Sequence, residues 1–187
     1  MIQNRDTLET TDNGWIAVAL GVTIALLAAL SSSLYARAEQ AEKTVANFEA
    51  EPKVQQMAEA YSLDMVDYAK KQFGIELNWS DESIRQIEQI ADTLHKAYEK
   101  DRPPIDKIAP FYKMMGSYIG EVFRRNYGAE WGWVILEGNR FPGMQRKPSN
   151  LFWPWGKAQH RIVNGSEDNL WHYYAFLLRQ DEPGAKQ

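Results

Sequence analysis

Apolar residues recur every three or four positions through most of the chain beyond residue 52, which is the spacing of an amphipathic helix. This pattern predicts helices from Lys53 to about Phe73, from Ser80 to the Pro103-Pro104 pair, and from about Ile105 to Tyr127. Ser80 is a suitable N-cap for the second helix, and the two prolines exclude its continuation.

The pattern changes after Gly128. The stretch from Glu130 to Leu136 is typical of a strand, and Gly138-Asn139 suits a hairpin turn. A short helix from about Trp155 to Val163 and another that begins at the N-cap Ser166 end the domain. We therefore expect an α+β domain that is mainly helical and carries a small antiparallel β-hairpin or sheet.

Before this domain the chain carries a long apolar run. No residue from Asn13 to Ala36 is charged, and Trp15 to Leu30 is almost wholly apolar. As a helix the uncharged stretch rises about 36 Å, whereas the hydrocarbon core of a bilayer is about 30 Å thick. The pattern predicts a single transmembrane helix, with Trp15 and Tyr35 at its two ends.

A cleaved signal peptide is the alternative, because Ala36-Arg37-Ala38 has the form of a cleavage site. The leading segment argues against it, since it has one basic residue, Arg5, and three acidic ones. The bias of basic residues towards the C-terminal side of the apolar run places the following domain in the cytoplasm.

These patterns divide the chain into successive segments. We expect a polar tail at 1–13, a transmembrane helix at 14–36, a helical linker and first soluble helix at 37–73, a small α+β domain at 74–179, and a disordered tail at 180–187.

Composition and motifs exclude several classes of function. The net charge is −4, with acidic and basic residues well mixed, so the sequence lacks the basic footprint of a nucleic-acid-binding protein. The chain has no cysteine, which removes disulfides, thiolate metal sites and cysteine nucleophiles. His95, His160 and His172 do not have metal-ligand spacing, and no phosphate-binding or dinucleotide-binding loop is present. We expect neither a metal ion nor a cofactor.

The stretch GSYIGEVFRRNYGAEW, from Gly116 to Trp131, holds the most distinctive spacing. On a helical wheel Gly116 and Gly120 flank the apolar arc, so we interpret them as packing glycines, and Gly128 as a C-terminal cap. Glu121 and Arg125 fall towards the opposite flank, where an exposed i,i+4 ion pair is the default interpretation.

Two alternatives to this surface pair remain. Glu121, Arg124 or Arg125 can join the helix to Lys157 or Arg161 in a charged clamp. Glu121 is also the best candidate for a general acid or base, because it stands beside two glycines that let another backbone approach.

Tryptophans are dense in the C-terminal part of the chain, with five of the seven between Trp131 and Trp171. They indicate either a small core filled with large side chains or an aromatic-lined ligand cleft. Residues that bind a partner are expected among these tryptophans and the neighbouring arginines. They are Arg124, Arg125, Trp131, Trp133, Trp153 and Arg161.

The order of these motifs resembles a family of uncharacterised bacterial domains of unknown function. In that family a G-x-Y-x-G-E-x-x-R-R helix precedes G-x-x-W and a later K-x-x-x-R-x-x-N-G-x-E-D segment, matched here by GSYIGEVFRR, GAEW and KAQHRIVNGSED. The resemblance spans about residues 77–174 and implies a small α+β domain. It supplies no activity and no catalytic residues.

Two hypotheses for function follow. The first is a non-catalytic protein-interaction module that is tethered to the bacterial inner membrane by its single helix and binds another membrane or cytoplasmic protein through its aromatic C-terminal face. The second is a membrane-bound enzyme or small-ligand sensor that uses Glu121 with Arg125, His160 or Arg161. The orientation of Glu121 and of the tryptophans discriminates between them.

Overall fold

The structure is a computed structural model that describes residues 46–146 and 150–179. The predicted transmembrane helix at 14–36 and the tails at 1–13 and 180–187 lie outside the described residues. Among the residues that are described, no helix is long and apolar enough to span a bilayer. The described residues belong to one compact unit, Ala46–Gln187.

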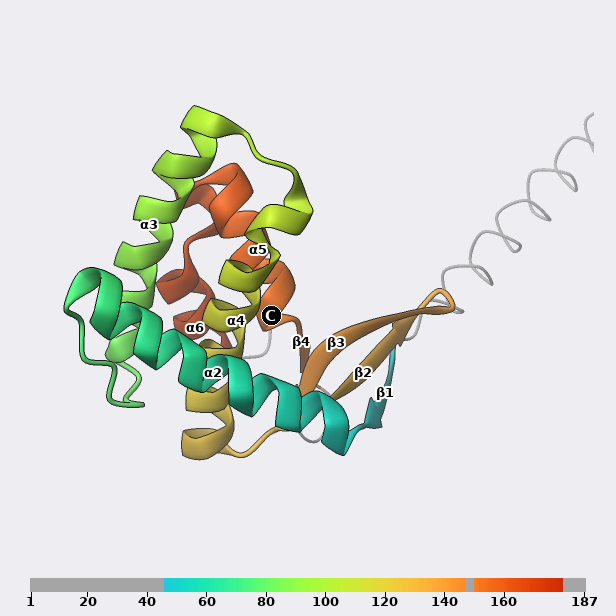
Figure 1. Ribbon diagram of the computed structural model, residues 1–187. Helices are drawn as coiled ribbons and strands as arrows, with labels where there is room; N and C mark the ends of the chain where they lie inside the picture. Colours follow the sequence, from blue (N-terminus) through green and yellow to red (C-terminus); the bar gives the residue numbers. More distant parts are fainter. Residues whose placement is uncertain (1–45, 147–149, 180–187) are drawn as a thin grey trace, which may run out of the picture. The chain divides into compact units, whose positions relative to one another are not determined.

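Strands and helices follow one another in blocks along the chain (Figure 1). They are β1 (Asn47–Ala50), α2 (Pro52–Phe73), α3 (Ser83–Asp101), α4 (Ile105–Tyr127), β2 (Glu130–Leu136), β3 (Asn139–Arg146), β4 (Asn150–Phe152), α5 (Pro154–Asn164), a short 3-10 turn (Ser166–Asp168) and α6 (Leu170–Arg179). The predicted α+β class is confirmed for the described region, which is mostly helical with a small antiparallel sheet.

Local chemistry explains where the long helices begin and end. Pro52 occupies the first turn of α2, and the side chain of Glu51 accepts a hydrogen bond from the backbone N–H of Lys53 at 3.0 Å. Gly74 ends α2 in the left-handed conformation with φ 68°, and Gly128 follows α4 with φ 71°.

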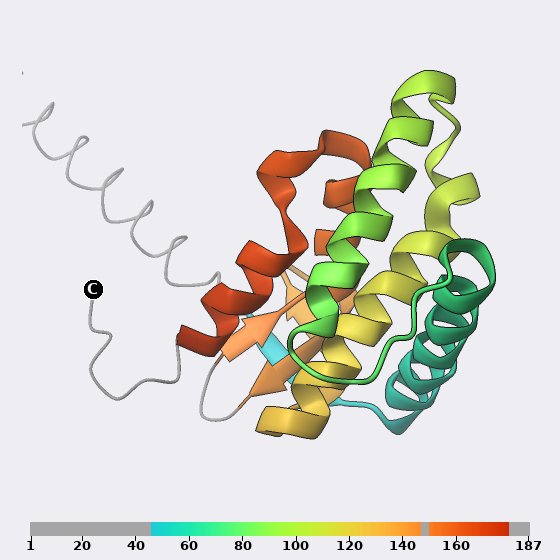
Figure 2. The ribbon, with the colours of Figure 1, turned by 90° about the vertical axis from the view of Figure 1, so that its left-hand side faces the viewer.

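Helix α4 is the centre of the fold and contacts both α2 and α5 (Figures 1 and 2). Every residue from Met115 to Phe123 is buried. A Cβ atom on Gly116 would lie 2.6 Å from the carbonyl oxygen of Pro154, and one on Gly120 would meet the Trp131 ring. The two glycines therefore let α5 and β2 approach the surface of α4 closely.

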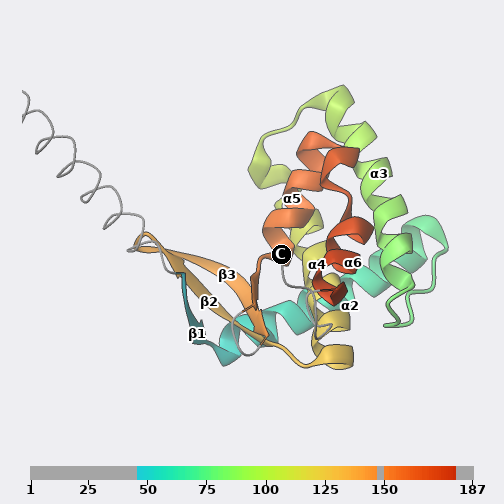
Figure 3. The ribbon, with the colours of Figure 1, turned by 180° about the vertical axis from the view of Figure 1, so that it is seen from behind.

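The sheet is antiparallel with the strand order β1-β2-β3-β4. In the register of β2 and β3, Trp131 lies opposite Met144, and both side chains reach the position of Gly120 on α4. Figures 1 and 3 show the turn between β2 and β3 standing away from the helices. One end of the sheet is thus packed on the helical core, and the other extends beyond it.

The prediction of a continuous helical linker before residue 52 is wrong for Asn47–Ala50, which forms β1. This segment pairs with β2 over its whole length, from Asn47 opposite Ile135 to Ala50 opposite Gly132. The absence of a side chain on Gly132 lets the Glu49 carbonyl come close. Long-range pairing therefore overrides the local helix propensity of these residues.

Two helix starts differ from the expected positions. Helix α3 begins at Ser83, because Ser80 lies in a preceding turn in which its Oγ accepts the backbone N–H of Ser83 at 3.3 Å. Ser166 begins a short 3-10 turn, and α6 starts at Leu170.

Candidate functional site

Glu121 is fully buried, with 0% of its surface exposed, so the prediction of an exposed flank is wrong. Its Oε1 accepts hydrogen bonds from Nε of Arg124 and from the indole Nε1 of Trp131, each at 2.9 Å. Its Oε2 accepts a further bond from Arg124 at 2.9 Å. Gly120 explains the error, since the space beside it admits the Trp131 ring over this side of α4.

The two arginines that follow Glu121 have different environments. Arg124 also reaches Glu59 on α2 at 3.1 Å, and the hydrogen bonds to Glu121 raise the pKa of its guanidinium. Arg125 lies 3.4 Å from Glu121 through Nε, and its guanidinium stacks 3.7 Å from the centre of the Trp79 ring. These contacts tie α4 to α2 and to the turn before α3, which is a structural role.

Arg161 does not join the Glu121 cluster. It is 1% exposed and binds Glu88 at 2.8 Å and Asp92 at 3.2 Å, both on α3. The other oxygen of Glu88 accepts the backbone N–H of Leu170 at 2.8 Å, which ties the start of α6 to the same pair. The predicted clamp from α4 to the C-terminal segment is therefore not formed by Arg161.

Lys157 is also engaged elsewhere. Its Nζ lies 2.6 Å from Asp168 in the turn that follows α5. The charged residues of the C-terminal segment thus pair with α3 and with their own neighbours in sequence.

A cluster around Asp81 was not anticipated from the sequence. Its carboxylate accepts hydrogen bonds from the hydroxyls of Tyr127 and Tyr174, the latter at 2.6 Å, and from the amide of Asn126 at 2.9 Å. Burial would raise the pKa of Asp81, but these hydrogen bonds outweigh it and the pKa is lowered. The bond to Asp81 raises the pKa of Tyr127 to about 12.

No sequence signal linked these residues, because Tyr127 lies 46 positions and Tyr174 lies 93 positions from Asp81. The cluster fastens the turn before α3 to the end of α4 and to α6. The two tyrosine hydroxyls and the Asn126 amide all donate to the Asp81 carboxylate. We therefore assign this cluster a structural role.

The histidines do not converge. Nδ1 of His95 lies 2.8 Å from the carbonyl oxygen of Ile162, whereas His160 and His172 are exposed on separate helices. Within the described parts of the chain, no group of three acidic or histidine side chains is placed to hold a metal ion.

A hollow of about 340 Å³ lies between the first half of α4, β3 and the start of α5. We call it the aromatic hollow, and its lining residues are Tyr112, Lys113, Phe141, Pro142, Trp153, Trp155, Gly156 and Gln159. Four of these side chains are aromatic, and Phe141 is 44% exposed. The hollow is thus a surface feature with large apolar rings at its walls.

Two residues shape the aromatic hollow. The indole N–H of Trp155 donates a 2.7 Å hydrogen bond to Ser117 on α4, which fixes the orientation of that ring. Gly156 keeps the space open, because a Cβ atom there would have only one neighbour within 4 Å, the Cβ of Trp153 at 3.8 Å.

Lys113 is the only charged side chain among the residues that line the aromatic hollow. Its ammonium lies 5.7 Å from the ring centre of Trp155 and 5.9 Å from that of Tyr61, within cation–π range. No carboxylate of residues 46–146 or 150–179 forms an ion pair with it. The hollow therefore combines aromatic walls with one positive charge.

The predicted binding residues are not brought together in one site. Trp153 lines the aromatic hollow, whereas Trp131 is 1% exposed in the core against Gly120. Trp133 lies on β2 with the guanidinium of Arg140 at 5.3 Å from its ring centre. Sequence reasoning missed Tyr112, Lys113 and Phe141, which come from two other elements.

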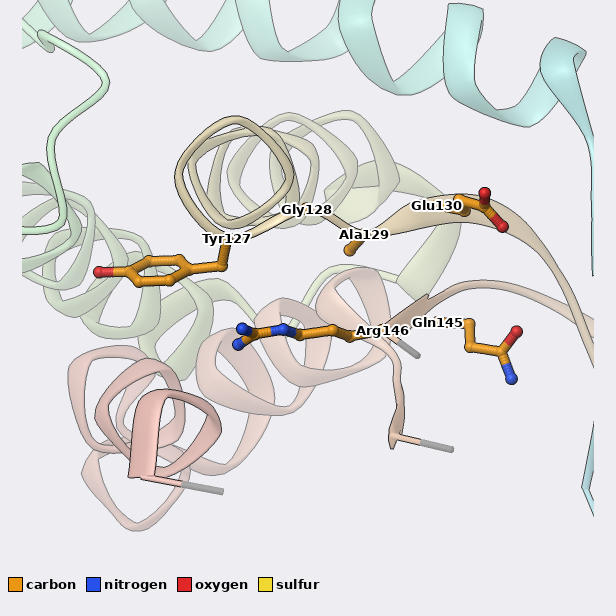
Figure 4. Close-up of a pocket in the computed structure, with 6 residues that line it drawn as sticks. All are labelled: Tyr127, Gly128, Ala129, Glu130, Gln145 and Arg146. Atoms are coloured by element: carbon orange, nitrogen blue, oxygen red, sulfur yellow. The ribbon is translucent and has the colours of Figure 1, made fainter. Parts of the chain in front are cut away.

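A second, more polar hollow of about 360 Å³ lies where α4 leads into β2 (Figure 4). Figure 4 shows Arg146 extended beneath Tyr127, with Glu130 and Gln145 at the other end. The guanidinium of Arg146 lies 5.7 Å from the ring centre of Tyr127. Because Glu130 and Arg146 each already have an interaction partner, this hollow is the lesser candidate.

No protein-family model and no curated protein matches the sequence. The fold is similar to a crystal structure from Bacteroides thetaiotaomicron VPI-5482, with a TM-score of 0.54 and 13% sequence identity. The match covers 72% of this chain and 48% of the other, so this chain spans about half the length of that protein. At this level of identity the similarity concerns the fold alone.

Proposed function

We propose that this chain is a non-catalytic protein-interaction module that is anchored to the bacterial inner membrane and binds a partner at the aromatic hollow. The observation that carries the proposal is the convergence of Tyr112, Phe141, Trp153 and Trp155 around one open hollow. Aromatic side chains are enriched at protein interfaces, because they bury a large area at a small cost in side-chain entropy.

The properties of Phe141 support this assignment. A large apolar side chain that is 44% exposed contributes nothing to the core, yet it stands beside the buried Trp155 and the half-buried Trp153. Covering such a ring with a partner removes apolar surface from water, at roughly 25 cal/mol per Å². The hollow therefore resembles the apolar, aromatic centre of a protein interface.

The alternative, an enzyme or ligand sensor that uses Glu121, has less support. Both carboxylate oxygens of Glu121 accept hydrogen bonds from Arg124, and one also binds Trp131. A general base needs an oxygen directed at the proton that it removes. Glu121 is surrounded instead by donors from its own fold.

The membrane anchor rests on the apolar sequence from Asn13 to Ala36, and the cytoplasmic position of the domain rests on the basic residues that follow it. Extraction of cell membranes with alkaline carbonate should leave the full chain in the pellet. A C-terminal green fluorescent protein fusion should fluoresce, whereas a C-terminal alkaline phosphatase fusion should be inactive. The reverse result would overturn the orientation, and recovery in the soluble fraction would overturn the anchor.

Site-specific crosslinking in living cells tests the interaction. A photoreactive phenylalanine analogue is placed at position 141 in the aromatic hollow or, as a matched control, at position 176 on α6, since Phe176 is 48% exposed outside the hollow. We expect one partner protein to crosslink from position 141 and not from position 176. Filling the hollow with Gly156→Leu should remove that crosslink. Equal crosslinking from both positions would count against the proposal.

A further inference from the structure

We infer that the aromatic hollow takes an extended, proline-containing acidic segment of the partner protein. This inference rests on the proposed function and adds the chemistry of the ligand. Three observations carry it: the charge of the lining, the flat aromatic walls, and the size of the space.

The positive charge of Lys113 in the lining favours a negatively charged ligand. Lys113 is the one charged group in the lining, and its described contacts are with the rings of Tyr61 and Trp155. The ammonium group of a lysine has three N–H donors. An aromatic ring attracts the charge but does not accept these hydrogen bonds as strongly as a carboxylate oxygen does. A ligand carboxylate placed over the rim can accept these hydrogen bonds without displacing an internal partner.

The walls favour proline. Extended proline-rich segments bind grooves lined with aromatic rings, because the polyproline II conformation is already formed and loses little entropy on binding. Tyr112 on α4, Trp153 just before α5 and the mostly buried Trp155 on α5 contribute rings to the lining. Pro142 on β3 adds a further apolar face. Gln159 contributes an amide that can pair with a peptide backbone group.

The space suits a few residues of a peptide. Its volume of about 340 Å³ is at the low end of the range for ligand pockets, roughly 300–1,000 Å³. Gly156 in the lining has no side chain to fill the space, and a Cβ atom there would have only one neighbour within 4 Å. A large cofactor would exceed this space, whereas one or two proline rings with a flanking carboxylate fit its chemistry.

The chain itself contains a segment of this type, Asp181-Glu182-Pro183, after α6. A partner segment and the chain's own segment share the same chemistry, so the test must separate them. Deletion of residues 180–187 does so without changing the lining of the hollow.

The test uses the full chain in nanodiscs of zwitterionic phosphatidylcholine and fluorescein-labelled synthetic peptides, with fluorescence anisotropy as the readout. One peptide has four Glu-Pro repeats, and its matched partners have Gln-Pro, Lys-Pro or Glu-Ala repeats. We expect the Glu-Pro peptide to bind most tightly. The Gln-Pro peptide should bind about two- to fivefold more weakly, as expected for one partly exposed charge pair, and the Lys-Pro and Glu-Ala peptides more weakly still.

Three variants localise the binding. Lys113→Met should abolish the preference for Glu-Pro over Gln-Pro while leaving the affinity for Gln-Pro unchanged. Phe141→Ala should weaken both peptides by at least about fivefold, as for a residue at the centre of an interface. Phe176→Ala removes an exposed phenylalanine outside the hollow and should leave both affinities unchanged.

Each contrary result is decisive. Equal binding of the Glu-Pro and Lys-Pro peptides, or a preference that survives Lys113→Met, would overturn the assigned charge. Binding that appears only after deletion of residues 180–187 would assign the hollow to the chain's own terminal segment instead of a partner. If the crosslink from position 141 persists while no Glu-Pro peptide binds, the ligand chemistry is wrong and the proposed function stands. If both are absent, both fail.

Discussion

The indole N–H of Trp131 donates a 2.9 Å hydrogen bond to Oε1 of Glu121, and both residues are buried. Gly120 makes this contact possible, because the Trp131 ring occupies the space that a side chain would take there. The carboxylate thereby accepts hydrogen bonds from both Trp131 and Arg124. The stretch from Gly116 to Trp131 thus places a hydrogen-bonded polar cluster inside the core.

This arrangement predicts a large loss of stability when Glu121 is changed. Glu121→Ala removes the buried one of the two carboxylate partners of Arg124 and leaves the Trp131 indole without an acceptor. We therefore expect the free energy of unfolding to fall by about 2–4 kcal/mol. Urea unfolding followed by circular dichroism measures it.

Glu59→Ala is the matched control for that experiment. Glu59 also pairs with Arg124, but its side chain is 40% exposed, so the loss should stay below about 1 kcal/mol. Equal losses for the two variants would contradict the structural role assigned to Glu121.

Two helical glycines should respond to alanine with opposite signs. Gly116→Ala drives a Cβ atom to within 2.6 Å of the Pro154 carbonyl, so we expect a loss of about 1–3 kcal/mol. Gly156→Ala meets nothing closer than 3.8 Å and should stabilise the protein by up to about 1 kcal/mol through helix propensity. Thermal unfolding of the two variants beside the unchanged protein measures both effects, and shifts of the same sign would refute the packing assigned to Gly116.

Arg161 should behave as a core residue. Arg161→Ala leaves the carboxylate of Glu88 without its cation, so we expect a loss of about 3 kcal/mol. Lys71→Ala breaks an ion pair with Asp67 in which both side chains are about 70% exposed, and it should change stability by less than about 0.5 kcal/mol. Chemical unfolding of both variants makes the comparison, and a small effect of Arg161→Ala would return this residue to the list of binding candidates.

The Asp81 cluster predicts a specific alkaline transition. The folded protein holds the pKa of Tyr127 at about 12, above the ordinary value of 10.0, because its hydroxyl donates to Asp81. A raised pKa favours the protonated form in the folded state, so this stabilisation is complete below pH 10 and is lost as the pH rises through about 12. Tyrosinate absorbance near 295 nm, recorded against Tyr127→Phe, isolates this titration.

Asp81→Asn provides the control for that titration. The asparagine keeps a side-chain oxygen as acceptor but removes the negative charge, so the pKa of Tyr127 should return towards its ordinary value. A midpoint for Tyr127 near 10 in the unchanged protein would show that the Asp81 bond does not form.

The main helices could be predicted from the sequence because their evidence is local. Apolar spacing together with Pro52 and Gly74 defines the bounds of α2. Apolar spacing and the Gly128 cap define α4 in the same way, from Ile105 to Tyr127. Strand β1 could not be predicted, because its residues favour a helix locally and acquire their strand conformation from pairing with β2.

The candidate site depends on contacts between distant segments. Trp153 was predicted to bind, but its neighbours in the aromatic hollow include Tyr112 on α4 and Phe141 on β3. A helical wheel also places Glu121 on an exposed flank, because it includes only the residues of one helix. It does not include β2, whose Trp131 covers this side of α4. The same limit hid the pairing of Arg161 with α3.

The sequence by itself determined the helical framework, the positions of its close-packing glycines and the prediction of an apolar anchor ahead of the domain. These features depend on periodicity, backbone conformation and hydropathy, which act over a few neighbouring residues. The tertiary structure decided that Glu121 and Arg161 are both buried, each in its own set of ion pairs, and that Lys113 lines the aromatic hollow. Burial and charge pairing depend on which distant side chains meet in the folded chain, and that information appears only when the helices and the sheet pack together.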